Sequence, residues 1–291
     1  MKLGDVLAEW IDVRSQKTKQ STNKNIVRIL NRNYQHLFNL DCVDIKPRKI
    51  LDATQNNSIS TYDAKRALAA ITSVFDYACV LDIIQNNPAA RLTKFIQSHN
   101  SVNRKHLKSE HEFIKLLRDI NKSNSSKSII NALLVLIYTA QRRSEIIPAK
   151  WGEIDFYNRL WNIPAERMKM KQDHVIPLSE TVINILNEQK KLSSEYVFPS
   201  SKKINYHINK SAPISVLYVA GYKKKQTIHG FRTLFSTIAH SSGLWSSDAI
   251  EMQLAHKITG VRGVYNKSNY LEERVRMMSW YAKQLDFWRT L

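Results

Sequence analysis

Apolar residues recur at helical spacing along the first part of the chain, which predicts a helical module there. The clearest runs lie at 3–11, 26–37 and 67–75, where apolar side chains return every three or four positions. Polar segments that separate the runs are predicted at 15–22, 46–48 and 55–58. Pro88 is predicted to close the last helix, because a proline disfavours helical geometry in the residue before it.

The second part of the chain mixes helical periods with one pair of strands. Helices are predicted at 109–120, 129–138, 180–191, 214–221, 231–241, 247–254 and 271–291. Segments 160–163 and 174–178 are typical of antiparallel strands joined by 164–173. The expected fold class is mainly α with a small antiparallel sheet, that is, α+β.

Between these parts, residues 98–108 are polar and basic and show no apolar period, as in a linker between domains. A chain of 291 residues is long enough for two domains, each with its own core. We therefore expect a helical domain at 1–95, a basic linker at 96–107 and a second domain with a helical tail at 108–291.

The charge of the chain favours a polyanionic partner. Lysine and arginine outnumber aspartate and glutamate by 44 to 25, a net charge of +19. The stretch 196–247 contains no acidic residue, which is typical of a surface that lies against phosphates. The candidate DNA-contacting residues are Arg104, Lys105, Lys202, Lys203, Lys223, Lys224 and Lys225.

Cysteine usage and the amino-terminal segment indicate the compartment. Cys42 and Cys79 are too few for a disulfide framework, and neither has the close Cys or His neighbours of a structural zinc site. Asp5 and Glu9 interrupt the segment where a secretory signal would be apolar, and no apolar run reaches membrane-spanning length. We expect a cytoplasmic protein with no membrane partner.

Five short segments carry side chains suited to phosphodiester chemistry. They are Thr139-Ala-Gln-Arg-Arg-Ser-Glu145, Met168-Lys-Met170 ahead of 174–178, His229-Gly-Phe-Arg232, Leu254-Ala-His256 and Tyr265-Asn-Lys267. Phosphodiester transfer without a metal needs a nucleophile, cations on the nonbridging oxygens and an acid for the leaving oxygen. The planar fork of an arginine can hold two phosphate oxygens, and a tyrosine hydroxyl, with a pKa of about 10, attacks best in positive surroundings.

In order and spacing these segments resemble the catalytic region of the tyrosine recombinases, the phage integrase family. The resemblance covers 107–285 and, more weakly, the helical module before it. Segments 165–170 and 270–280 resemble in particular the prophage and genomic-island integrases of the satellite-phage type. Such integrases carry an additional amino-terminal arm-binding domain, which this chain is expected to lack.

The resemblance implies a role for each candidate. Tyr265 would be the nucleophile, Lys169 would protonate the departing 5′ oxygen, and Glu145 would support the neighbouring arginine. The phosphate-binding residues would be Arg142, His229, Arg232 and His256. No metal, ATP or other cofactor is implied.

Three positions leave alternatives open. Lys171 lies two residues after Lys169 on the same side of the hairpin, and Tyr270 lies five residues after Tyr265. The family usually has glycine where Ala140 stands, a departure that bears on how tightly the chain turns before the arginine pair.

The implied function is site-specific recombination of double-stranded DNA through a 3′-phosphotyrosyl intermediate and a Holliday junction. The implied assembly is a tetramer on DNA at the bacterial nucleoid, with DNA-bending proteins as accessory partners. The apolar positions of 271–288 predict an amphipathic tail helix that docks on a neighbouring protomer or folds back on its own domain. A type IB topoisomerase activity and a DNA-binding remnant without catalysis are the alternative functions.

Overall fold

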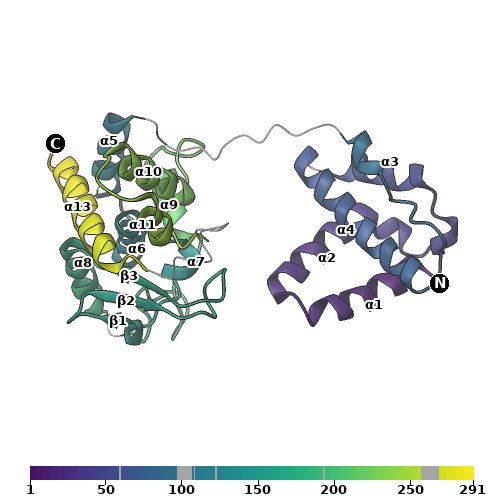
Figure 1. Ribbon diagram of the computed structural model, residues 1–291, viewed down its shortest axis with the longest axis horizontal. Coiled ribbons are helices and arrows are strands. Elements are labelled where there is room, and N and C mark those ends of the chain that lie inside the picture. The colour runs from purple at the N-terminus through teal and green to yellow at the C-terminus, as the bar shows by residue number, and fades with distance from the viewer. Residues whose placement is uncertain (59, 97–106, 108, 122, 193, 257–268) are drawn as a thin grey trace. The chain divides into compact units, whose positions relative to one another are not determined.

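The computed structural model describes the chain except for residues 59, 97–106, 108, 122, 193 and 257–268. The chain divides into two units, Met1–Val102 and Asn103–Leu291 (Figure 1). Within the described parts, no helix is both long and apolar enough to cross a membrane.

The amino-terminal unit consists of helices around one apolar core. Its α-helices are α1 (Leu3–Ser15), α2 (Gln20–Tyr34), α3 (Pro47–Asn57) and α4 (Thr61–Val80), with 3-10 turns at Gln35–Leu37, Cys42–Asp44 and Leu92–Phe95. Leu3, Leu30 and Ile71, from three different helices, are fully buried in this core. Helix α4 packs against all three other helices, and the hydroxyl of Ser60 caps it by accepting the N–H of Asp63.

Helix α3 occupies a region that the sequence pattern assigns to polar breaks, so that prediction is wrong. Pro47 takes the first helical position, where its missing N–H would have no helical partner. The helix buries Ile50, Ala53 and Thr54, and the Thr54 hydroxyl lies 2.6 Å from that of Tyr34 on α2. A short buried face with polar ends therefore forms a helix because its neighbours cover it.

The end of α4 also differs from the prediction. The helix stops at Val80 rather than near Pro88, and Asp82 takes a left-handed backbone conformation with φ 56°. The N–H of Asp82 donates to the carbonyl of Cys79 at 3.1 Å, which closes the turn. Segment 86–88 belongs to the connection that follows.

The carboxy-terminal unit surrounds one buried helix. Its α-helices are α5 (Glu110–Asn121), α6 (Lys127–Thr139), α7 (Arg143–Ile146), α8 (Glu180–Lys190), α9 (Ala212–Val219), α10 (Ile228–Ser241), α11 (Ser247–Gln253) and α13 (Leu271–Thr290), with a 3-10 turn at Trp151–Glu153. Helix α6 is apolar along most of its length and packs against α8, α9, α10 and α13. This arrangement is why 129–138 shows an almost continuous apolar run.

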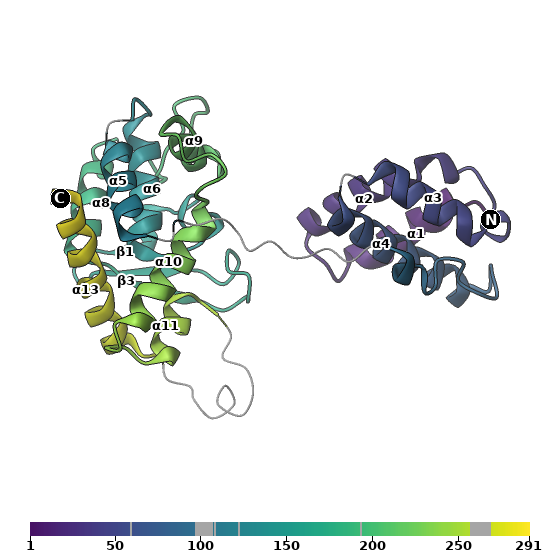
Figure 2. The same ribbon diagram turned by 90° about the horizontal axis from the view of Figure 1, so that it is seen from above.

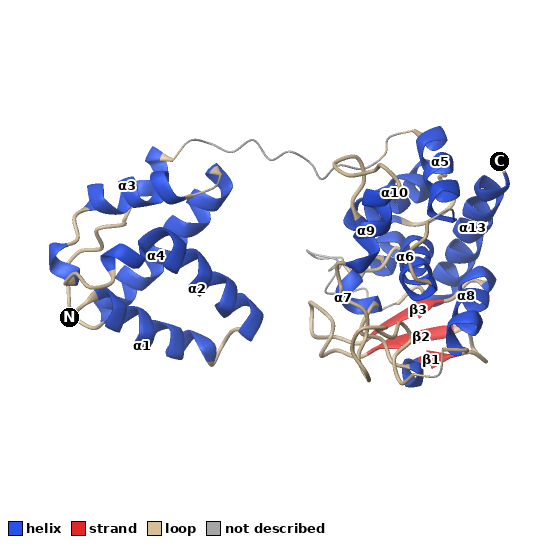
Figure 3. Ribbon diagram, turned by 180° about the vertical axis from the view of Figure 1, so that it is seen from behind, coloured by secondary structure: helices blue, strands red, loops and turns tan. Residues whose placement is uncertain are grey.

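The strands form one antiparallel sheet in the order β1-β2-β3 at one edge of the unit (Figure 3). The strands are β1 (Ile154–Asp155), β2 (Leu160–Ile163) and β3 (His174–Pro177). Leu160 pairs with Pro177 and Ile163 with His174, as expected for a hairpin closed by 164–173. The two-residue strand β1 was not predicted, because alternation cannot be recognised over two positions. The fold class, mainly α with a small antiparallel sheet, is confirmed.

Helix α13 packs along its own unit (Figure 2). Tyr281 lies edge-on against Phe235 of α10, and Trp288 lies edge-on against Phe113 of α5, with ring centroids 5.0 and 5.7 Å apart. Met277, Leu285 and the aromatic anchors are buried in the core of the unit. The tail therefore folds back on its own domain through its buried face, whereas Val275 and Phe287 are exposed. Docking of the tail on a neighbouring protomer stays a prediction.

Candidate active site

The turn before Arg142 follows directly from the end of α6. Ala140 caps this helix in the left-handed conformation, with φ 55° and ψ 28°. That conformation suits glycine and costs an L-residue roughly 1–2 kcal/mol. The chain therefore turns as tightly with alanine as glycine would allow, and the Ala140 carbonyl is directed to Arg232 of α10 at 2.6 Å.

Arg142 is held by a buried carboxylate. Glu145 is 1% exposed. Its Oε1 accepts a hydrogen bond from the Arg142 guanidinium at 3.0 Å, and its Oε2 accepts one from the Arg142 backbone N–H at 3.1 Å. The Arg142 side chain is 22% exposed, and its Nη2 lies 3.5 Å from the Ala255 carbonyl oxygen. Glu145 thus fixes both the backbone and the charged end of this arginine.

Arg232 is the more deeply buried of the two arginines, at 3% exposure. Its Nη1 donates to the carbonyl of Ala140 and its Nη2 to that of Leu254, both at 2.6 Å. Burial, followed by the nearby charge of Arg142, lowers the pKa of Arg232 to about 10. The group stays cationic at neutral pH, and two neighbouring cations of this kind favour an anion between them.

The amino-terminal turn of α10 places His229 and Arg232 three residues apart. The Thr227 hydroxyl caps the helix by accepting the N–H of Gly230 at 3.0 Å. A pocket of about 510 Å³ is lined by Gln141, Arg142, Arg143, Ser144, Ile214, Thr227, Ile228, His229 and Arg232. A helix amino terminus adds its positive dipole end to these side chains, which makes the pocket suitable for a phosphate.

His256 joins this cluster through the residues that follow α11. Its Nε2 lies 3.1 Å from Nη2 of Arg232, and its Nδ1 lies 2.7 Å from Oε2 of Glu251. Glu251 was not among the predicted site residues. In the sequence it is marked by nothing more than its place five residues before His256, and its contact with the ring depends on the left-handed backbone of Ala255 (φ 47°), which turns the chain back.

Lys169 lies near the tip of the β2–β3 hairpin and is exposed. The loop is fastened at its base by the N–H of Ala165, which donates to Asp173 at 2.8 Å. It is also anchored by Arg167, which forms an ion pair with Glu153, and by Met168, which is 2% exposed. Lys171 is also exposed, in a left-handed conformation with φ 53°. Neither lysine is among the residues that line the pocket, so the described site brings together the arginines and histidines but not the candidate acid.

The predicted nucleophile, Tyr265, lies outside the described residues, as do Arg104 and Lys105. Its rival Tyr270 lies immediately before α13, and its hydroxyl donates to a carboxylate oxygen of Asp248 at 3.1 Å. Tyr270 is not among the residues that line the pocket.

The described lysines proposed to contact DNA are all exposed: Lys202, Lys203, Lys223, Lys224 and Lys225. Lys203 places its ammonium 4.2 Å from the ring centre of Tyr206, and Lys223 lies 5.7 Å from that of Tyr218. Cations beside exposed rings form a surface that suits a phosphate backbone.

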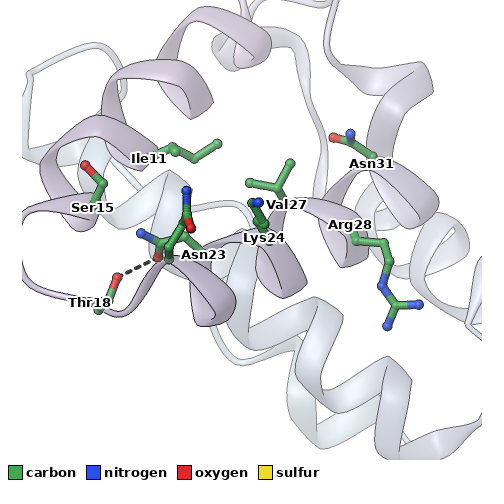
Figure 4. Close-up of a pocket in the computed structure, with 9 residues that line it drawn as sticks. Ile11, Ser15, Thr18, Asn23, Lys24, Val27, Arg28 and Asn31 are labelled. Atoms are coloured by element: carbon green, nitrogen blue, oxygen red, sulfur yellow. Dashed lines mark hydrogen bonds between the residues drawn. The ribbon is translucent and has the colours of Figure 1, made fainter. Parts of the chain in front are cut away.

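A second hollow, of about 670 Å³, lies on the amino-terminal unit between α1 and α2 (Figure 4). Lys24 and Arg28 line it from α2, Ile11 and Ser15 line it from α1, and none of its lining residues is acidic. This hollow has no group able to cleave a phosphodiester, so it suits binding of an anionic partner rather than catalysis.

His174, the first residue of β3, is buried close to this cluster. Burial, followed by the charge of Arg274, lowers the pKa of His174 to about 3, and Arg232 and Arg142 act in the same direction. The ring is therefore neutral at physiological pH.

Among the described residues, no group of three or more His, Cys, Asp or Glu side chains is arranged to hold a metal ion.

Two family models match the chain. The phage integrase family model matches residues 108–272, and the phage integrase central domain model matches residues 3–95. The chain is 32% identical over 290 residues to the integrase of Shigella phage Sf6, a match that covers 97% of this chain and 74% of that protein. It is 30% identical over 260 residues to the integrase of Enterobacteria phage P4, covering 83% and 58%.

Solved structures share the fold. A lambda integrase(75-356) dimer bound to a COC′ core site matches with a TM-score of 0.70 at 17% identity, covering 93% of this chain and 97% of that one. A lambda integrase tetramer bound to a Holliday junction matches with a TM-score of 0.68 at 18% identity, covering 88% and 78%. The fold, the family models and the phage relatives agree, and the chain belongs to the phage integrase family, as a tyrosine site-specific recombinase.

Proposed function

We propose that Tyr265 attacks a DNA phosphodiester to form a 3′-phosphotyrosyl bond and release a 5′ oxygen. Arg142, Arg232, His229 and His256 bind the nonbridging oxygens, and Lys169 gives its proton to the departing 5′ oxygen. The 5′-hydroxyl of a partner duplex then attacks the phosphotyrosine, which returns the tyrosine and completes strand exchange. The energy of the broken bond is retained in the covalent link, so the cycle needs no ATP or metal.

The arrangement of Arg142, Arg232 and His256 carries this proposal. Two arginines from different elements are held side by side by Glu145 and by backbone carbonyls, in a pocket that opens at a helix amino terminus. Preorganised cations of this kind bind the charge that develops on a phosphate in the transition state without first having to rearrange.

We further propose that the chain acts as a tetramer on paired double-stranded DNA sites at the nucleoid, assisted by DNA-bending proteins. One lambda integrase structure with this fold is a tetramer bound to a Holliday junction. The exposed lysines and the basic hollow of the amino-terminal unit provide cations for such a duplex. A requirement for two sites would separate this activity from that of a type IB topoisomerase.

The nucleophile is tested with a nicked duplex bearing the recombination site recovered from the DNA that flanks the gene. Tyr265→Phe removes only the attacking oxygen, so it should abolish the SDS-resistant protein–DNA complex and leave DNA binding nearly intact. Tyr270→Phe is the matched control and should retain the complex. The wild-type reaction should proceed fully in EDTA, and an SDS-resistant complex formed by Tyr265→Phe would refute the assignment.

A further inference from the structure

We infer that Glu251 is a positioning residue of the recombination reaction, which orients His256 and stabilises its doubly protonated form on the phosphate. The inference rests on the proposed function, because it assigns Glu251 a part in the same site. Glu251 does not touch the reacting atoms. It acts through the imidazole ring that lies between it and Arg232.

The hydrogen bonds of His256 determine which ring nitrogen carries the proton. A guanidinium has donors only, so Nε2 of His256 must accept the hydrogen bond from Arg232 at 3.1 Å. A neutral imidazole then carries its proton on Nδ1, which donates to Oε2 of Glu251 at 2.7 Å. Without DNA, Glu251 therefore selects the tautomer whose Nε2 is unprotonated.

When a phosphate is bound, Nε2 must act as a hydrogen-bond donor instead of an acceptor. To hydrogen-bond a phosphate oxygen, Nε2 has to donate, and it can donate while Nδ1 still faces Glu251 only if both nitrogens are protonated. The extra proton comes from solvent as DNA binds. The Glu251 carboxylate supplies the negative charge that favours this imidazolium, as a carboxylate does behind a catalytic histidine.

The surrounding charges make this contribution necessary. Arg232 from α10 and Arg142 beside α7 both disfavour a third cation, and the carboxylate of Glu145 is already paired with Arg142. Of the charged groups described around the ring, Glu251 remains to offset the new charge, besides the phosphate itself. The backbone N–H of His256 also donates to the backbone carbonyl of Glu251 at 3.0 Å, a contact that Glu251→Gln leaves in place.

The test compares Glu251→Gln with wild type in single-turnover cleavage of a nicked site whose scissile bond carries a 5′-bridging sulfur. Sulfur leaves without a proton, so the pH profile no longer depends on Lys169. The glutamine oxygen can still accept the Nδ1 proton, but it carries no charge. The imidazolium should therefore be less stabilised, and the alkaline limb of the pH–rate profile should move to lower pH.

A double-mutant cycle separates positioning from a general structural effect. In a His256→Ala background, Glu251→Gln should change the cleavage rate by less than about twofold, because its effect passes through the missing ring. The matched control is Glu272→Gln, which removes an exposed carboxylate from the first turn of α13 and should leave the profile unchanged. Thermal unfolding of each variant checks that the fold is retained.

The outcomes distinguish this inference from the proposed function. If wild type cleaves and Glu251→Gln keeps the wild-type pH profile, the inference is wrong and the proposed function stands. The same conclusion follows if Glu251→Gln slows cleavage equally with and without His256. If wild-type protein forms no covalent complex, the proposed function fails and the inference fails with it.

Discussion

The arginine cluster and the β2–β3 hairpin are positioned by opposite means. Arg232 is 3% exposed and donates to carbonyls at the ends of two separate helical segments, while Glu145 holds Arg142 from beneath. The Lys169 side chain is exposed, although the loop that carries it is anchored by the Arg167–Glu153 ion pair and by buried Met168. The groups proposed to bind phosphate are thus built into the core, whereas the group proposed to deliver a proton is carried by a surface loop.

The difference follows from what each group must do. Binding a developing charge is most effective when the donors are already in place, because no reorganisation is then needed during the reaction. A proton donor has to reach the leaving oxygen only after DNA has filled the site, and a flexible lysine on a hairpin can do so. We therefore expect changes in the cluster to affect both folding and chemistry, and changes of the exposed hairpin lysines, Lys169 and Lys171, to affect chemistry alone.

Lys169→Ala should give the largest effect confined to chemistry. Loss of a general acid typically slows a reaction by about 10²–10⁴-fold, and cleavage of an ordinary site should fall within this range. The free energy of unfolding should not change, because the Lys169 side chain is exposed. Both are checked by single-turnover cleavage and chemical denaturation.

The bridging-sulfur substrate and Lys171→Ala provide the controls for that experiment. Cleavage of the sulfur substrate should be restored in Lys169→Ala, and Lys171→Ala should resemble wild type on both substrates. If the sulfur substrate instead restores cleavage by Lys171→Ala and not by Lys169→Ala, the general acid is Lys171, two residues from the one proposed.

Arg232→Lys should reduce cleavage next most strongly and should also affect the fold. A lysine keeps the charge but has no planar guanidinium, so it cannot donate hydrogen bonds to two carbonyls and a phosphate at the same time. Loss of one preorganised donor lowers a rate by about 10²–10³-fold. The carbonyls of Ala140 and Leu254 also lose donors, so the denaturation midpoint should fall. A stable variant with slow cleavage would break the proposed link between the cluster and the core.

The sequence was sufficient for the fold class and for most helices, whereas the roles of the candidate side chains stay predictions. Apolar periods predicted the helices because packing repeats every three or four residues, and the buried α6 gave an unbroken apolar run. Helix α3 was missed because Pro47 and the amides at its end are typical of breaks. The sequence left open what covers the tail, because an apolar face is visible in a sequence but its packing partner is not.

The contacts within the site could be predicted less well than its members. Residue spacing placed His229 and Arg232 on one helix face, which the structure shows. It could not show that Glu251 contacts His256, since that contact depends on the backbone turn at Ala255. The roles of Lys169 and of Tyr265, which lies outside the described residues, stay predictions.

His174 tests whether a buried ring at the base of the hairpin stays neutral in mild acid. Its pKa is about 3 in the folded chain, against about 6.5 for an unperturbed histidine. Between these values the unfolded chain binds a proton that the folded chain does not, so stability falls as pH drops from about 6.5 toward 3. Through His174, the free energy of unfolding changes by at most about 1.4 kcal/mol per pH unit.

Urea denaturation from pH 7 to pH 4 measures this effect. His174→Gln removes the titration, so its stability should fall less steeply with acid than that of wild type. His240→Gln, at an exposed position of α10, is the control and should keep the wild-type slope. Equal slopes for wild type and His174→Gln would mean that the buried ring is not kept neutral.

Ala140→Gly should give the smallest effect, and it should be stabilising. Alanine in the left-handed conformation costs roughly 1–2 kcal/mol, and glycine loses part of that gain through the greater entropy of its unfolded chain. We expect a net gain of about 1 kcal/mol, seen as a rise of roughly 2–4 °C in Tm, with cleavage unchanged because the carbonyl still meets Arg232. Ala132→Gly, in the interior of α6, should instead destabilise by about 1 kcal/mol or more. If both glycine variants lose stability, the turn that positions the cluster is not the left-handed one, and alanine replaces glycine there by changing the backbone rather than by straining it.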